Sequence, residues 1–387
     1  MSSSQLKSQI AKFAKIPPTG ISLKEMCEIG SIPSQESLYK SNKFIVNELP
    51  IRLAHRIEEL DTLPNGLNKM SSIEKVKNWY TKSFEELIEI NSLSTSNSSN
   101  SSSINHHIKF NRLVTDTLKT IKKRHDPTVA TVAQGVLEWK NSTNQNLVNY
   151  SIQSFLDRFY MSRIGIRMLI GQNIAINEEP SRDNYVGVIC KRTNLKEVAI
   201  DAIDNSRFIC EEYYGIFESP EIELICPNIK GEETEKDLTF MYVPGHLMHM
   251  LFEILKNSLR ATVETTIKSN PGIDLDQLKF KPIKLIIIKG LEDITIKISD
   301  EGGGIPRSEI PLVWTYLYTT IKEIPDLDPS YNKTDFRAPM AGFGYGLALS
   351  RLYARYFGGD LKLMSMEGYG TDVYLHLNRV STTEALQ

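Results

Sequence analysis

The sequence predicts an α+β protein in which an N-terminal helix bundle is followed by a C-terminal α/β sandwich with a mixed sheet. Two observations support this fold class. Apolar residues recur at helical spacing through the first half, most clearly over 151–176. From about residue 181 onward, short strand-like segments alternate with helical ones. We therefore expect a helical domain over 1–180, an α/β domain over 181–380 and a short tail over 381–387.

Amphipathic stretches at 73–90, roughly 108–138 and 151–176 predict the helices of the bundle. In the last of these, Ile152, Phe155 and Phe159 recur about one turn apart. Residues 92–103 interrupt the pattern, because eleven of these twelve residues are Ser, Thr or Asn. Such a tract buries too little apolar surface to offset its ordering entropy, so we expect a disordered loop there.

The second half predicts strands and two helices. The expected helices cover 247–267 and 346–357, and the expected strands cover 186–190, 222–225, 239–243, 284–289, 294–299, 360–366 and 371–377. Short glycine-containing connections at 290–293 and 367–370 predict two antiparallel hairpins.

Composition excludes several classes of function. Forty-five Lys and Arg against 47 Asp and Glu give a net charge of −2, which argues against a nucleic-acid-binding protein. No apolar run approaches the ~18 residues of a transmembrane helix. The four cysteines have no C-x-x-C spacing, so we expect neither a zinc site nor a disulfide scaffold. So few cysteines are typical of a protein in a reducing compartment.

The first two candidate functional segments carry polar side chains. On the helix expected at 247–267, His249, Glu253, Asn257 and Arg260 are spaced by four, four and three residues and share one face. In the other segment, Asp300 ends a strand and is followed by glycines at 302–304. A carboxylate there can accept a hydrogen bond from an exocyclic amine such as that of adenine, and the glycines allow close backbone approach.

The third segment is the glycine loop Gly342–Gly346, which opens a helix. Free amides at a helix N-terminus suit a phosphate group. The loop does not follow a strand in a βαβ unit, which argues against a Rossmann site, and the Walker pattern is absent. The H-R-D and D-F-G motifs of the usual protein kinases are also absent.

Taken in order, these segments resemble the boxes of the Bergerat ATP-binding fold, which is found in histidine kinases, DNA gyrase and mitochondrial dehydrogenase kinases. Gly368–Thr371 before the last strand adds to the match. The segments at 48–54, 79–80, 133–138 and 155–169 resemble the helical domain of pyruvate dehydrogenase kinases. The likeness spans about residues 5–378.

This resemblance implies a serine kinase that uses Mg-ATP to phosphorylate and inactivate the alpha subunit of the pyruvate dehydrogenase complex. It implies that Asn257 binds Mg²⁺, that Glu253 is the general base and that His249 hydrogen-bonds and orients Glu253. A mobile ATP lid is expected over 321–341. The implied ATP-binding residues are Glu253, Lys256, Asn257, Arg260, Asp300, Gly302, Gly304, Thr319, Thr320, Gly342, Phe343, Gly344, Tyr345, Gly346, Leu347 and Thr371.

The resemblance also implies an allosteric pocket for pyruvate-like acids in the helical domain, where arginines suit a small carboxylate. Lys122 stands where the family has arginine. The implied pocket residues are Leu53, Tyr80, Ser83, Ile121, His125, Ser162, Arg163 and Arg167.

The implied partners are the lipoyl domain of the acetyltransferase core and a second copy of the chain, which pairs through the sheet that carries Tyr374 and His376. The implied location is the mitochondrial matrix. Residues 1–24 carry four Lys, five Ser and no acid, as in matrix-targeting segments, but they also lack Arg. Since the tail after the last strand is short, we expect a weaker grip on the lipoyl domain than in longer-tailed relatives.

Three alternatives stay open at this point. A branched-chain ketoacid dehydrogenase kinase would perform the same chemistry on another substrate, and the short tail favours it. A histidine autokinase would use His125 in the segment His125–Thr128 as the phosphoryl acceptor. An ATPase clamp of the same fold would hydrolyse ATP without phosphate transfer.

Overall fold

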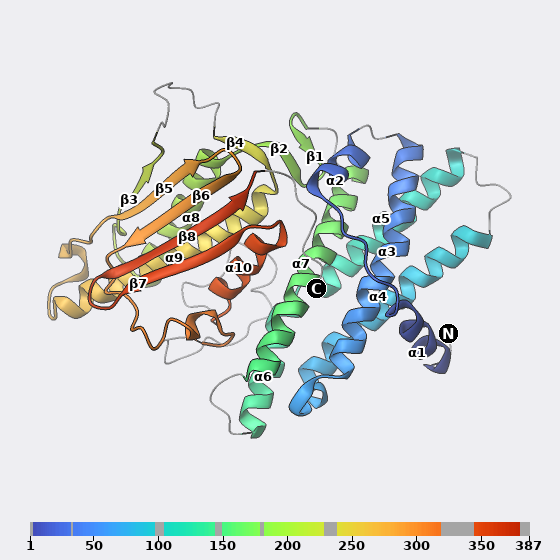
Figure 1. The fold of residues 1–387 in the computed structure, drawn as a ribbon, viewed down its shortest axis with the longest axis horizontal. Coiled ribbons are helices and arrows are strands. Elements are labelled where there is room, and N and C mark those ends of the chain that lie inside the picture. The colour runs from blue at the N-terminus through green and yellow to red at the C-terminus, as the bar shows by residue number, and fades with distance from the viewer. Residues whose placement is uncertain are drawn as a thin grey trace. The chain divides into compact units, whose positions relative to one another are not determined.

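The computed structural model describes residues 3–31, 34–96, 104–143, 149–178, 182–227, 238–318 and 344–379. The described residues up to Cys190 form one compact unit, and those from Lys191 form another, whereas the sequence pattern changes near 180. Helices make up most of the first unit, and a five-stranded sheet with helices makes up most of the second (Figure 1). The predicted α+β class is confirmed.

The first unit is a helix bundle whose core is formed by α3, α4, α5 and α7, with Leu49, Phe84 and Phe159 fully buried. Trp139 on α6 is also buried, and its indole nitrogen donates a hydrogen bond of 3.0 Å to the carbonyl of Asn65. Its helices are α1 (Ser3–Phe13), α2 (Leu23–Gly30), α3 (Gln35–Asp61), α4 (Ser71–Ser96), α5 (Ile104–His125), α6 (Thr128–Thr143) and α7 (Tyr150–Glu178).

Two predictions for this unit need correction. The single helix expected over 108–138 is divided into α5 and α6, because Pro127 disfavours helical backbone at the residue before it. The loop expected over 92–103 is wrong over 92–96, since α4 continues to Ser96. Residues 97–103 lie outside the described part of the chain.

The second unit contains a mixed five-stranded sheet in the order β3-β5-β6-β8-β7. Strand β3 runs parallel to β5, and the other neighbours are antiparallel. Both predicted hairpins, β5–β6 and β7–β8, are confirmed. The strands are β3 (Ile222–Ile225), β5 (Ile283–Lys289), β6 (Asp293–Asp300), β7 (Asp360–Met366) and β8 (Gly370–Asn378).

A smaller sheet has the order β1-β2-β4 and contains β1 (Tyr185–Val186), β2 (Ile189–Asn194) and β4 (Thr239–Tyr242). The single strand expected over 186–190 is wrong, because a turn at Gly187 with φ of 60° makes β1 and β2 a hairpin. Helix α8 (Leu195–Tyr214) was not predicted. Its signals are the capping side chain of Asn194 and the left-handed Gly215 that ends it.

Helices α8, α9 (Pro244–Ser269) and α10 (Gly346–Tyr356) lie on one face of the five-stranded sheet (Figure 1). Along β6, Ile294, Ile296 and Ile298 alternate with half-exposed polar residues and are fully buried. Leu251, Leu255 and Leu259 fill the core side of α9. The packing of α9 on β6 brings the polar side chains of α9 to the end of the strand. No described helix is both long and apolar enough to cross a bilayer.

Candidate functional site

A pocket of about 450 Å³ lies in the second unit, between α9, the loop after β6, the start of α10 and strands β7 and β8. It is lined by residues from each of the three predicted segments. The predicted residues that line it are Glu253, Lys256, Asn257, Arg260, Asp300, Gly302, Gly304, Gly344, Gly346, Leu347 and Thr371. The fold therefore brings together in one cavity three segments that lie far apart in the sequence.

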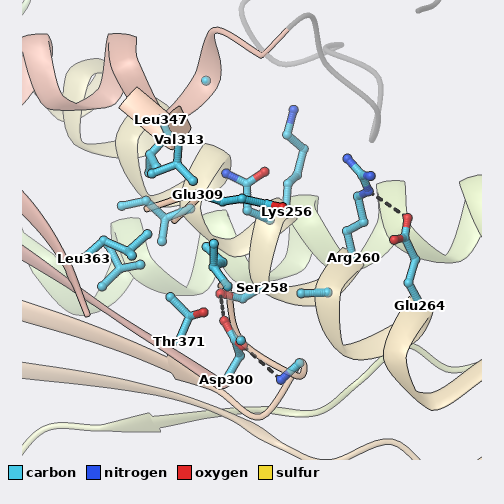
Figure 2. A pocket seen from close by; sticks show the side chains of 18 of the residues that line it. Lys256, Ser258, Arg260, Glu264, Asp300, Glu309, Val313, Leu347, Leu363 and Thr371 are labelled. Atoms are coloured by element: carbon cyan, nitrogen blue, oxygen red, sulfur yellow. Dashed lines mark hydrogen bonds and ion pairs between the residues drawn. The ribbon is translucent and has the colours of Figure 1, made fainter. Parts of the chain in front are cut away.

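Asp300 forms one wall of the pocket, and hydrogen bonds from Ser258 and Gly302 hold its side chain (Figure 2). The Ser258 hydroxyl donates to Oδ2 over 2.9 Å, and the Gly302 backbone N–H donates to Oδ1 over 3.0 Å. Burial raises the pKa of Asp300 above its usual value, although these hydrogen bonds oppose the shift. The side chain is thus a fixed acceptor for a ligand N–H, which agrees with the predicted contact to an adenine amine.

Three glycines pack closely against their neighbours around Asp300. A Cβ atom on Gly370 would lie 2.0 Å from the Asp300 carbonyl oxygen, and one on Gly302 would lie 2.6 Å from the Ala261 Cβ. Gly304 has φ of 69°, and a Cβ there would lie 2.0 Å from the Met366 carbonyl oxygen. These contacts leave no room for side chains, so the glycines are required by close backbone packing.

Glu253 and Lys256 form a buried ion pair on α9. The Lys256 Nζ lies 2.9 Å from the Glu253 Oε1, and the two side chains are 3% and 11% exposed, respectively. Burial raises the pKa of Glu253, but the charges of Lys256 and His249 outweigh burial and leave the pKa below its usual value. The carboxylate is therefore ionised at neutral pH, as a general base must be.

His249 lies one turn before Glu253, half-buried, and its ring packs edge-on against Tyr353 with centroids 4.9 Å apart. Its charge lowers the pKa of Glu253. The structure thus places His249 where it influences the carboxylate, although it does not line the pocket. The hydrogen bond expected between the two side chains stays a prediction.

Several pocket residues differ from the expectation. Ser258, Ile254 and Ala261 were not among the predicted site residues, but they line the pocket because the core and the cavity meet along α9. The apolar and polar pattern of a single helix does not show where a cavity opens beside the core. Other lining residues that the sequence did not reveal are Glu264, Thr265, Lys268, Ile305, Pro306, Glu309, Val313, Tyr318, Leu363 and Val373.

Arg260 and Glu264 form the far wall of the pocket (Figure 2). The Arg260 Nε donates to the Glu264 Oε1 over 2.8 Å, so Arg260 is paired within its own helix. Tyr345 is buried against Tyr316, with ring centroids 5.0 Å apart, and does not line the cavity. The predicted site residues Thr319, Thr320, Gly342 and Phe343, and the lid expected over 321–341, lie outside the described residues.

The helical unit contains a second buried polar group. The rings of Tyr80 and His125 stack 4.4 Å apart, and the Ser83 hydroxyl lies 3.0 Å from the His125 Nε2. Burial lowers the pKa of His125 to about 3 and raises that of Tyr80 to about 12. Arg163 and Arg167 act on both groups electrostatically, so much of the predicted allosteric set does lie together.

The remaining predicted allosteric residues include Leu53 and Ile121, which are buried, and Ser162, which is half-buried on α7. The sequence did not reveal Arg124, which donates to Ser83 over 2.8 Å and to both carboxylate oxygens of Glu86. Arg167 donates to Asp126 over 2.8 Å. His125 is only 2% exposed, which disfavours it as a phosphoryl acceptor.

Comparisons with known proteins agree with this arrangement. Residues 242–381 match the family model described as histidine kinase-, DNA gyrase B- and HSP90-like ATPase, and residues 20–190 match the model described as mitochondrial branched-chain alpha-ketoacid dehydrogenase kinase. A mitochondrial pyruvate dehydrogenase (acetyl-transferring) kinase of Schizosaccharomyces pombe is 44% identical over 99% of this chain and 98% of its own length. The chain belongs to the mitochondrial pyruvate dehydrogenase kinase family.

Further members show similar agreement. The Arabidopsis thaliana kinase of the same name is 42% identical over 97% of this chain and 94% of its own length. Human isozyme 4 is 39% identical over 97% of this chain and 84% of its own length. Membership in this kinase family confirms the resemblance drawn from the motifs and assigns an ATP-binding domain of this fold to the second unit.

The buried ion pair of this kinase-family site predicts strong coupling between its two partners. Lys256→Met leaves an uncompensated buried carboxylate and should lower the free energy of unfolding by about 3–5 kcal/mol. Glu253→Gln combined with Lys256→Met removes both charges and should cost less than the two single changes added together. Urea unfolding of the wild type, both single variants and the double variant measures this coupling. Strictly additive losses would contradict it.

Burial of His125 predicts a pH dependence of stability. Its pKa in the folded state is about 3, whereas an exposed histidine has a pKa of about 6.5. Between these values the unfolded chain binds a proton that the folded chain does not, so the free energy of unfolding falls as the pH drops below about 6.5. The slope from this group reaches about 1.4 kcal/mol per pH unit.

His125→Phe keeps a ring beside Tyr80 but cannot bind the proton. Its free energy of unfolding should therefore fall less between pH 7 and pH 5.5 than that of the wild type. Urea unfolding at both pH values measures the difference. Equal slopes for the two proteins would show that His125 does not carry this dependence.

Proposed function

We propose that this chain is an ATP-dependent protein-serine kinase that phosphorylates, and thereby inactivates, the alpha subunit of the pyruvate dehydrogenase complex. The observation that carries the proposal is the match over nearly the whole chain to relatives named as pyruvate dehydrogenase kinases. The pocket supports it, because an ionised Glu253 and a fixed acceptor at Asp300 line one cavity.

In the proposed reaction, Asp300 accepts a hydrogen bond from the adenine amine, and the start of α10 at Gly346 faces the phosphates. Glu253 accepts the proton of the substrate serine hydroxyl while the serine oxygen bonds to the γ-phosphorus and the bond to the β-phosphate oxygen breaks. ADP leaves with the electrons of that bond. The protein contributes mainly positioning and charge stabilisation.

Magnesium is part of this proposal. Asn257 lines the pocket and is exposed to it, and its carboxamide oxygen suits this hard cation. Groups of three or more His, Cys, Asp or Glu residues that could hold a metal are absent from the described residues. The single carboxamide oxygen of Asn257 fits Mg²⁺, which is bound through few protein oxygens together with substrate phosphates. When bound, the ion neutralises charge that develops on the phosphates.

The alternatives differ in what supports them. The family model that matches residues 20–190 is named after the branched-chain kinase. The full-length relatives above are named as pyruvate dehydrogenase kinases. These full-length matches favour the pyruvate enzyme. The burial of His125 disfavours the autokinase, and full-length similarity to kinases disfavours a clamp ATPase.

The same proposal includes the expected location, partners and effector site. Relatives named as mitochondrial kinases support the mitochondrial matrix. The lipoyl domain of the acetyltransferase core is the expected docking partner. The buried cluster around Tyr80, His125 and Arg163 is the proposed site for a pyruvate-like acid, since its arginines can pair with a small carboxylate.

Labelled ATP tests the proposed activity directly. Incubation with purified pyruvate dehydrogenase and, separately, with branched-chain dehydrogenase should label the alpha subunit of the pyruvate enzyme in an acid-stable form. Glu253→Gln should slow this transfer about 100-fold or more, because the general base is lost. Asn257→Ala should abolish Mg²⁺-dependent ATP binding, which calorimetry measures.

Matched controls are Glu292→Gln on the exposed β5–β6 turn and Asn205→Ala on the exposed side of α8, neither of which lines the pocket. Label on the branched-chain subunit would reassign the substrate. Acid-labile label on the kinase itself would support the autokinase, and ATP hydrolysis without any labelled protein would support the clamp.

A homodimer is the last part of the proposal. On β8, Tyr374 and His376 lie on the face opposite the helices, half-buried and with stacked rings 6.5 Å apart. Light scattering should give twice the mass of 43.9 kDa at micromolar concentration. His376→Glu should lower the measured mass, whereas Tyr369→Glu on the exposed β7–β8 turn should not. A wild-type protein with the mass of one chain would refute the dimer.

A further inference from the structure

The geometry around Glu253 gives its two carboxylate oxygens different surroundings. Oε1 lies 2.9 Å from the Lys256 Nζ. Oε2 lies against the start of α10, because a Cβ on Gly346 would be only 2.1 Å from it. Lys256 therefore holds Oε1, and the oxygen beside Gly346 and the proposed phosphate site is Oε2.

The ionisable groups that act on Glu253 are few. On α9 these are Lys256 and His249. Helix α10 faces the carboxylate with the backbone of Gly346, and β6 contributes Asp300 to the same pocket, where it is bonded to Ser258 and Gly302. The further charged residues lining the cavity are Arg260, Glu264, Lys268 and Glu309.

Lys256 itself is buried to the same degree as a core residue. Its side chain is 3% exposed, and its ammonium group lies 5.0 Å from the centre of the Phe252 ring. A buried ammonium ion is costly unless a counter-charge compensates it. The carboxylate therefore stabilises the lysine as much as the lysine stabilises the carboxylate.

We propose that Lys256 is a positioning residue for the phosphoryl transfer: its ammonium group holds the Glu253 carboxylate ionised and leaves Oε2, beside Gly346, to accept the serine proton. This role rests on the proposed kinase function and adds to the contact with ATP expected from the sequence. The lowered pKa of Glu253 agrees with it. A lysine that served only the phosphates would affect ATP binding but not the protonation of the base.

The pH profile of transfer separates the two roles. In Lys256→Met, the acidic limb of the pH profile of kcat should move up by about 1–3 pH units. An opposite charge at this distance shifts the pKa of a carboxyl group by that amount. Lys256→Arg should restore the limb. Lys362→Met, exposed on β7, should leave it in place. A raised KM for ATP with an unmoved limb would overturn the proposal.

Infrared spectroscopy provides a readout that does not depend on activity. In a pH titration, the protonated carboxyl band of Glu253 should appear at a pH about 1–3 units higher in Lys256→Met than in the wild type, and it should be missing from the variant that also carries Glu253→Gln. Lys256→Gln serves as the second variant if Lys256→Met does not fold. A band that appears at the wild-type pH in both variants would overturn the proposal. A wild-type protein that transfers no phosphate would refute the kinase assignment. The infrared band would still show whether Lys256 keeps the Glu253 carboxylate ionised.

Discussion

The packing of α9 against β6 is the constraint on which the α/β unit depends. Side chains alternate along a strand, so Asp300 shares the buried face of β6 with Ile294, Ile296 and Ile298. The alternation that builds the core therefore turns a carboxylate toward the helix. Ser258 on α9 and the backbone of Gly302 supply the hydrogen bonds that a buried carboxylate needs, and the pocket opens beside them.

The two buried carboxylates of the pocket differ in their electrostatic surroundings. Lys256 and His249 stand next to Glu253 and lower its pKa, whereas Asp300 has hydroxyl and amide donors and its pKa is raised by burial. Different surroundings thus suit the same chemical group to the two proposed functions. Glu253 is the proposed proton acceptor, and Asp300, held by its hydrogen bonds, is the proposed acceptor for the adenine amine.

Much of the fold follows from local pattern. Strands with regular alternation, such as β5, β6 and β8, and the hairpins between strands were predicted closely, because each depends on neighbours in the sequence. Helix α8 was missed although Asn194 and Gly215 mark its two ends. The break at Pro127 was likewise visible but was overridden by the apolar periodicity on both sides of it.

The candidate site was less predictable in its supporting residues than in its motifs. Glu253, Asn257 and Asp300 stand in recognisable segments, but the role of Ser258 depends on which strand lies across from α9. Arg124 meets Ser83 and Glu86 across 41 and 38 residues, respectively, and no local spacing marks such pairs. Contacts of this kind arise from tertiary packing, which a single helix pattern does not contain.

The tightly packed glycines around Asp300 have a consequence for engineering. Since Gly302, Gly304 and Gly370 meet backbone or Cβ atoms of their neighbours, replacement with a larger residue displaces the main chain rather than reshaping the cavity. The size of the cavity can instead be changed through apolar side chains of its walls, such as Val313, Leu347 and Leu363. Truncation of one of these would admit a bulkier ligand while the main-chain frame around Asp300 keeps its form.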